Sequence, residues 1–221
     1  MTACWYGLSK FLCWLTLRVG FGLVVSGREH VPARGACIVA SNHVSFLDPV
    51  VVGVACPRRL AFMARDTLFA QPLLGVWLRA VGAIPVHRHE ADPSAIRAAL
   101  RRLRAGRPLA LFPEGGRQLS GALGSAKRGV GLLAMAARAP IVPVYLEGTF
   151  RALPPGARWF RRAKIRVAFG PAVAYTERSA PSAPEAARAP ARPSGSPGRA
   201  RQEQLAQAVT DRWRRLAEEM E

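Results

Sequence analysis

Ser41-Asn42-His43-Val44-Ser45-Phe46-Leu47-Asp48-Pro49 follows directly on the apolar run Ala36–Ala40. The apolar run is typical of a buried strand. Pro49 disfavours helical backbone at Asp48 and suits the first turn of a helix, so we expect Asp48 to be the N-cap of a helix over Val50–Ala55. The stretch therefore predicts a strand, a tight loop that carries His43, and then a helix.

His43 and Asp48 are candidate catalytic residues. On a continuous helix, side chains five positions apart are rotated by about 140° and do not meet, so a contact between these two requires the predicted turn. In contact, Asp48 would fix the tautomer of the imidazole, and neutral His43 could take a proton from a hydroxyl group. The spacing alone is weak evidence, because Asp48 could also be only a helix cap.

Strands and helices alternate along the rest of the chain. Each predicted helix has an apolar stripe or a start signal, such as Asp92-Pro93 before the stripe of Ile96, Leu100 and Leu103. This alternation predicts an α/β fold with a mostly parallel central sheet flanked by helices. The predicted strands are Leu60–Ala64, Ala83–Val86, Pro108–Phe112, Ile141–Tyr145 and Lys164–Phe169, and the predicted helices are Pro72–Val81, with an apolar face of Leu73, Leu74, Trp77 and Leu78, Pro93 to about Gly106, and Gly129–Arg138.

Positive charge dominates the composition. The 221 residues include 32 Lys and Arg against 14 Asp and Glu, a formal net charge of +18, which implies an anionic partner such as a phosphorylated substrate, an acidic membrane surface or a nucleic acid. Arg97–Arg107 contains no aromatic residue, and Arg158–Arg166 contains only Trp159 and Phe160. Single-strand binding surfaces interleave more aromatic residues than this, so we expect no nucleic-acid partner.

The two ends of the chain differ from its centre. Residues 1–30 are expected to be a membrane-interface segment, as a helix or helical hairpin, because Trp5–Val25 is bulky and apolar but is interrupted by Lys10 and Arg18. The alternative is a core helix that covers the sheet. The α/β domain is expected over residues 31–177, and a flexible Pro/Ala/Ser/Arg linker over residues 178–200. Residues 201–221 are expected to form an amphipathic helix that docks on the domain, on a membrane or on a partner.

Two further segments place functional groups after predicted strands. Arg88 follows Ala83–Val86, and Glu114, Gly115 and Arg117 follow Pro108–Phe112. The carboxyl ends of parallel strands are where such sheets bind ligands, glycine allows close backbone approach, and arginine grips phosphate with two parallel hydrogen bonds. Arg65 and Lys127 could add positive charge, and His87 and His89 have no carboxylate partner that the sequence suggests. The four cysteines have no metal-site spacing and are expected to be reduced, buried thiols of an intracellular protein.

Four segments in order resemble the motifs of the glycerolipid acyltransferases, the lysophosphatidic acid acyltransferase family. They are Asn42-His43 with Asp48, Gly82-Ala83-Ile84-Pro85-Val86-His87-Arg88, Phe112-Pro113-Glu114-Gly115-Gly116-Arg117, and Ile141-Val142-Pro143-Val144. The resemblance covers roughly residues 36–170. It implies a histidine base with its aspartate, and a glycerol phosphate held by Arg88 and by Glu114, Gly115 and Arg117. Gly116 departs from the family, which usually has Thr or Ser there, so the identity of the acceptor is open.

The resemblance implies transfer of a fatty acyl group from an acyl thioester to the hydroxyl of a lysophospholipid, with lysophosphatidic acid giving phosphatidic acid as the leading case. The donor would be acyl-coenzyme A or acyl carrier protein, with no metal or other cofactor. The expected location is the cytoplasmic face of the cell membrane, as a peripheral or monotopic protein on an anionic surface. The alternatives are another lysolipid acceptor, or a non-enzymatic basic protein that binds membrane or nucleic acid. A serine hydrolase is disfavoured because the chain has no Gly-x-Ser-x-Gly segment.

Overall fold

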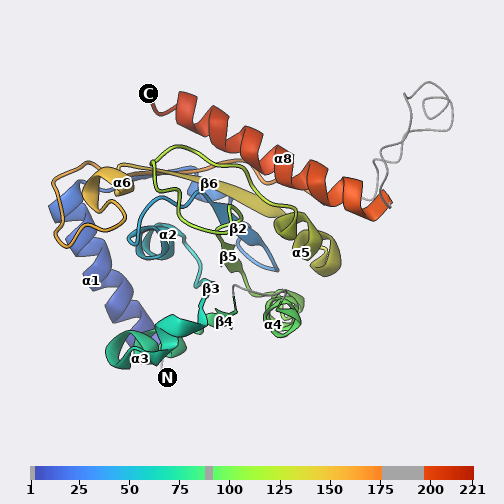
Figure 1. Ribbon diagram of the computed structural model, residues 1–221, viewed down its shortest axis with the longest axis horizontal. Coiled ribbons are helices and arrows are strands. Elements are labelled where there is room, and N and C mark those ends of the chain that lie inside the picture. The colour runs from blue at the N-terminus through green and yellow to red at the C-terminus, as the bar shows by residue number, and fades with distance from the viewer. Residues whose placement is uncertain (1–2, 88–91, 176–196) are drawn as a thin grey trace.

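A seven-stranded sheet with helices on both faces forms the body of the protein (Figure 1). The computed structural model describes residues 3–87, 92–175 and 197–221. The strands are β1 (Val24–Ser26), β2 (Ile38–Ser41), β3 (Ala61–Arg65), β4 (Ile84–Val86), β5 (Leu109–Leu111), β6 (Ile141–Glu147) and β7 (Arg166–Phe169). The helices are α1 (Ala3–Phe21), α2 (Asp48–Ala55), α3 (Pro72–Ala80), α4 (Pro93–Arg104), α5 (Gly129–Ala137), α6 (Thr149–Ala152) and α8 (Pro197–Glu218), with short 3-10 turns at Arg28–His30 and Asp66–Ala70.

The sheet is parallel except at one pair of strands. Its order is β1-β7-β6-β2-β5-β3-β4, and only the β6–β7 pair is antiparallel. This confirms the predicted α/β fold, with each predicted strand within a few residues of its expected place. Strand β1 was not predicted, because three residues at a sheet edge leave no periodic signal of their own. It pairs with β7, so residues 24–26 belong to the sheet and not to an interfacial helix.

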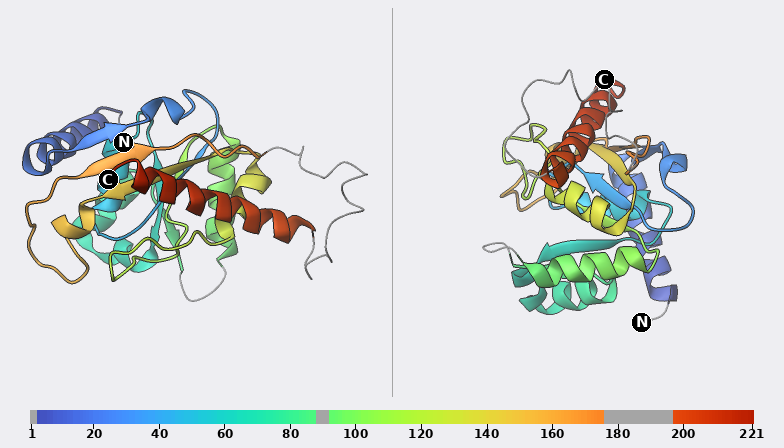
Figure 2. Two further views of the ribbon diagram at one scale, coloured as in Figure 1. Left: turned by 90° about the horizontal axis from the view of Figure 1, so that it is seen from above. Right: turned by 90° about the vertical axis from the view of Figure 1, so that its right-hand side faces the viewer.

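Two apolar clusters fill the two faces of the sheet. One lies between the sheet and α2 and includes Val39, Val51 and Phe169, while the other lies under α4, α5 and α8 and includes Ile38, Leu109 and Trp213. Figure 2 shows α8 running along the body beside α5. Trp213 is fully buried, and its indole N–H donates to the carbonyl of Ala40 at 3.0 Å. Of the three places considered for the C-terminal helix, docking on the domain is therefore the one observed.

Local signals explain where two helices begin and which faces they bury. Asp92 caps α4 as predicted, since its carboxylate accepts the backbone N–H groups of Ser94 and Ala95 at 3.0 Å each. In α3 the predicted apolar face is only partly correct: Leu78 is buried, but Leu73 is 89% exposed. The helix packs mainly on the short turn Asp66–Ala70, and its residues Leu73 and Val76 stay exposed.

Helix α1 exposes most of its large apolar residues, and its two charged side chains bond backbone carbonyls. Lys10 donates to the carbonyl of Cys56 and Arg18 to that of Leu23, whereas Leu17 is the buried apolar residue of the helix. The large apolar side chains that α1 exposes are Leu8, Phe11, Leu12, Trp14, Leu15 and Val19. Helix α1 packs against α2 and places Leu17 in the apolar cluster between α2 and the sheet, so its inner side belongs to the core, as the alternative of a core helix expects. A membrane-interface role for its outer side stays a prediction. No helix within the described residues is both long and apolar enough to cross a bilayer.

Candidate active site

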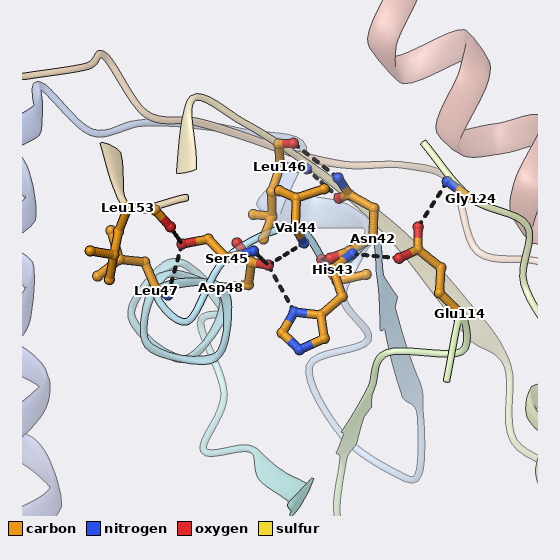
Figure 3. A network of polar contacts seen from close by, with 11 residues as sticks. Asn42, His43, Val44, Ser45, Leu47, Asp48, Glu114, Gly124, Leu146 and Leu153 are labelled. Atoms are coloured by element: carbon orange, nitrogen blue, oxygen red, sulfur yellow. Dashed lines mark hydrogen bonds and ion pairs between the residues drawn. The ribbon is translucent and has the colours of Figure 1, made fainter. Parts of the chain in front are cut away.

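The loop after β2 is pinned to its neighbours by two buried polar side chains. Asn42 exchanges two hydrogen bonds with the backbone of Leu146 in β6, donating to its carbonyl at 3.1 Å and accepting its N–H at 2.8 Å. Ser45 donates to the carbonyl of Leu153 at 2.7 Å (Figure 3). Because β2 and β6 are adjacent strands, these bonds fix the direction in which His43 leaves the sheet.

The predicted pair of His43 and Asp48 forms at this loop. Nδ1 of His43 lies 2.8 Å from Oδ2 of Asp48, and the same oxygen accepts the backbone N–H groups of Val44 and Ser45 at 2.7 Å each. Asp48 is fully buried, while the His43 side chain remains 12% exposed. A carboxylate held by three donors is fixed in place and fixes the imidazole in turn.

The expectation that Asp48 caps the helix is wrong. Helix α2 already includes Asp48, and Leu47 is the residue at its N-cap position. The carboxylate points back into the loop, where Val44 and Ser45 offer N–H groups that have no strand partner. Pro49 still explains the start of the helix, since it occupies the first turn, where no N–H is needed.

The second ring nitrogen of His43 is directed away from Asp48. Figure 3 shows the imidazole with one nitrogen toward the carboxylate and the other on the opposite side of the ring. The ring stacks on Phe112, with 4.2 Å between centroids and 26° between planes. With a proton held on Nδ1 by Asp48, Nε2 carries the lone pair that can accept a proton. Sequence reasoning did not single out Phe112, which lies just after β5.

Glu114 joins the loop after β5 to the loop that carries His43. Its carboxylate accepts the backbone N–H of His43 at 3.1 Å and that of Gly124 at 3.1 Å. Burial is the main influence on this group and raises the pKa of Glu114 to about 7. The hydrogen bonds to its carboxylate lower the pKa and so oppose the effect of burial. Glu114 was predicted to bind substrate. In the structure Glu114 is 3% exposed and its two oxygens bond the backbone of His43 and Gly124, so it holds the His43 loop in place. Contact of Glu114 with substrate stays a prediction.

Gly115 and Arg117 lie on the same loop as Glu114, beside His43. The N–H of Gln118 donates to the carbonyl of His43 at 2.8 Å, which holds the loop against the His43 loop. Gly115 has a positive φ of 79°, and a Cβ there would lie 2.8 Å from Nζ of Lys127. The guanidinium of Arg117 stacks on Phe46, 3.5 Å above the ring. The loop thus brings Arg117 against Phe46 of the His43 loop and Lys127 against Gly115.

Arg88, the remaining predicted site residue, lies outside the described residues. Strand β4, which precedes it, ends at Val86 and stands three strands from β2, about 14 Å at the usual strand spacing. Arg65 ends β3 between them and pairs with Val86. His87 lies 2.6 Å from a carboxylate oxygen of Asp66, a partner that the sequence did not suggest because Asp66 follows a different strand.

The hydroxyl groups nearest His43 in sequence are committed to the backbone. Ser41 donates to the carbonyl of Asn42, and Ser45 donates to that of Leu153. Neither is therefore oriented to give its proton to His43, so a base at this position would act on the hydroxyl of a bound substrate. The fold is an α/β sheet whose loop after β2 carries a histidine–aspartate pair, an arrangement that can activate the hydroxyl of an acceptor.

Comparisons with known proteins identify the family. The model of the Acyltransferase family matches residues 22–147, more than half of the chain, and the chain belongs to this family. A 1-acyl-sn-glycerol-3-phosphate acyltransferase of Bacillus subtilis is 29% identical over 150 residues, covering 67% of this chain and 72% of that protein. One from Borreliella burgdorferi is 30% identical over 144 residues, covering 63% of this chain and 56% of that protein.

The fold itself has a solved counterpart. The crystal structure of the 1-acyl-sn-glycerophosphate acyltransferase PlsC from Thermotoga maritima matches with a TM-score of 0.70 at 22% identity, covering 93% of this chain and 78% of that one. The match therefore includes most of the described chain. These comparisons confirm the family that the four sequence motifs indicate.

Proposed function

We propose that the protein is an O-acyltransferase that moves a fatty acyl group from an acyl thioester to the free hydroxyl of lysophosphatidic acid, giving phosphatidic acid. The observation that carries the proposal is the His43–Asp48 pair with a ring nitrogen directed away from the carboxylate, in a chain of the Acyltransferase family. The acceptor is inferred from the relatives, which are named as 1-acyl-sn-glycerol-3-phosphate acyltransferases. The chain spans 56% of one of them and 72% of the other.

The reaction follows from the geometry of the pair. As the acceptor oxygen attacks the thioester carbonyl, Nε2 of His43 accepts the hydroxyl proton, and Asp48 stabilises the imidazolium through the Nδ1–H bond of 2.8 Å. The tetrahedral intermediate then breaks its carbon–sulfur bond. The leaving sulfur takes the proton from Nε2, which returns the histidine to its neutral form.

The acceptor phosphate would bind along the carboxyl ends of the strands. Arg117 stacks on Phe46 and Lys127 lies against Gly115, both in loops joined to the His43 loop, and Arg65 ends β3 at the same end of the sheet. Guanidinium groups suit phosphate because their parallel N–H donors match two phosphate oxygens. Gly116 supports a second candidate, an acyltransferase acting on another lysolipid, since a hydroxyl that could bind the acceptor is missing there.

The exposed apolar surface suits a lipid-borne acceptor. Beside the outward face of α1, the loop before β7 exposes Trp159 and Phe160, which are 82% and 64% exposed, and Phe160 contacts Phe21 edge to face. The exposed Arg158, Arg161 and Arg162 flank them. Aromatic side chains mixed with arginines are typical of surfaces that bind the interface of anionic membranes. The protein would then lie on the cytoplasmic face, where a thioester donor, acyl-coenzyme A or acyl carrier protein, reaches His43 from solution.

A single assay tests the proposal. Purified protein is incubated with labelled acyl-coenzyme A or labelled acyl carrier protein and a panel of lysolipids with and without a phosphate monoester, and the lipids are separated. Labelled phosphatidic acid as the main product supports the proposal. Product from another lysolipid alone would favour the second candidate, and no product from any pair of substrates would contradict both.

A further inference from the structure

A second concentration of positive charge lies at the amino ends of the parallel strands, whereas His43 lies at their carboxyl ends. An open cavity of about 830 Å³ is lined by five arginines, together with apolar and backbone groups. Its lining comes from the segments that precede β3, β4 and β5, whereas His43 follows β2. All of these strands run in parallel, so the cavity is separated from the catalytic loop by the length of the sheet. We call it the arginine cavity, and its charged residues are Arg58, Arg59, Arg79, Arg102 and Arg107.

The protein holds these guanidinium groups with backbone carbonyls. Arg58 donates to the carbonyls of Pro32 at 2.8 Å and Gly106 at 3.3 Å, and Arg102 donates through Nε to that of Pro108 at 3.1 Å. Each guanidinium has five N–H donors, and these bonds use one or two of them. The remaining donors of a fixed guanidinium are oriented before any ligand arrives, which lowers the entropy cost of binding.

The charges of the cavity are not neutralised by neighbouring carboxylates. Its lining contains no Asp or Glu, and none of the ion pairs found among the described residues includes one of its five arginines. Burial, followed by the charges of Arg107 and Arg59, lowers the pKa of Arg102, so the guanidinium groups repel one another. A bound anion would relieve this repulsion.

We propose that the arginine cavity is a binding site for a ligand that carries two or more phosphate groups. Five guanidinium groups are more than a single phosphate can contact. The volume of the arginine cavity is also typical of a site for a small molecule and too large for a single ion. Two sources supply this chemistry: a soluble diphosphate, or the headgroup of a lipid with two phosphates. The second source has structural support, because Arg59 stacks on Tyr6 of the outward-facing helix α1, and Val76 in the cavity wall is itself exposed.

The test uses the full chain with two probes. Inorganic pyrophosphate is titrated calorimetrically, and flotation is measured with phosphatidylcholine vesicles that contain or lack cardiolipin. Arg59→Gln and Arg107→Gln remove exposed side chains of the cavity, and Arg104→Gln removes an exposed arginine of α4 outside its lining. Thermal unfolding and acyl transfer, measured for each variant, report whether the fold is kept.

The expected result is binding that depends on the cavity. Each cavity variant should weaken binding by about tenfold, while Arg104→Gln should bind like the wild type. Pyrophosphate binding with this dependence supports a soluble source, and cardiolipin-specific flotation with this dependence supports a lipid source. If neither probe binds, or if Arg104→Gln weakens binding as much as the cavity variants do, the site is overturned in favour of general surface charge.

Discussion

Replacing Asp48 by Asn tests the role of the carboxylate with the smallest change of shape. In the wild type, Oδ2 accepts three N–H groups, from His43, Val44 and Ser45. An amide nitrogen in place of Oδ2 would face three N–H donors, so in the variant the amide oxygen must occupy the position of Oδ2. The variant therefore keeps the imidazole oriented, and its effect on the chemical step comes from losing the negative charge that stabilises the imidazolium.

The magnitude follows from the charge separation. Two unit charges about 4 Å apart interact by about 4 kcal/mol at an effective dielectric constant near 20. Losing most of that interaction in the transition state should lower kcat by roughly 10²- to 10³-fold. The amide nitrogen would occupy the place of Oδ1, a buried atom that has no hydrogen-bond partner among the described residues. An unsatisfied donor there should also cost about 1–3 kcal/mol of folding free energy.

Steady-state kinetics with labelled acyl donor and lysophosphatidic acid, together with thermal unfolding, separate the two effects. Thr210→Ala serves as the control, because it removes a buried hydroxyl that bonds Ala126 and Ala206, far along the chain from the pair. The control should lose stability and keep kcat, whereas Asp48→Asn should lose both. A folded Asp48→Asn protein with the kcat of the wild type would refute the role given to the charge.

Three further changes test neighbouring parts of the site. Burial raises the pKa of Glu114 from 4.5 to about 7, so between these pH values the folded protein holds a proton that the unfolded chain releases. The free energy of unfolding should therefore fall by up to about 3 kcal/mol as the pH rises from 4.5 to 7. Glu114→Gln should make thermal unfolding less dependent on pH over this range, and an unchanged pH dependence would contradict the raised pKa. Arg117→Lys keeps the charge but loses the planar fork, so the Michaelis constant for lysophosphatidic acid should rise about tenfold and that for the donor should not; equal rises would point to a general defect. Trp159→Ser should weaken flotation with anionic vesicles about tenfold while Trp159→Phe keeps it, and equal flotation of both would remove this loop from the membrane surface.

The sequence predicted the parts of the molecule that depend on local signals. The apolar run before His43 forms β2 and Asp92-Pro93 begins α4, both as predicted. These predictions succeed because a buried strand and a helix cap each depend on a few consecutive residues. The turn that brings His43 to Asp48 was also correctly predicted, but its reason was not. Asp48 serves the backbone of the preceding loop and not the helix that follows it.

What the sequence missed depends on contacts between distant segments. The stacking of Phe112 on His43 and the bond from the His43 backbone to Glu114 require β2 and β5 to be adjacent, which no local pattern shows. The arginine cavity is a similar case. Its arginines come from the separate segments that precede β3, β4 and β5, and they lie together only because these strands are neighbours in the sheet.

The most direct test of the central claim is the formation of phosphatidic acid by the wild type and by His43→Ala. Purified proteins, matched for secondary structure and melting temperature, are given labelled acyl-coenzyme A, or acyl carrier protein in a parallel reaction, with lysophosphatidic acid in vesicles. In the proposed mechanism Nε2 of His43 is the base, so the wild type should form labelled phosphatidic acid with at least one donor, and His43→Ala should form none above background. Labelled phosphatidic acid produced by His43→Ala at the wild-type rate would contradict the account.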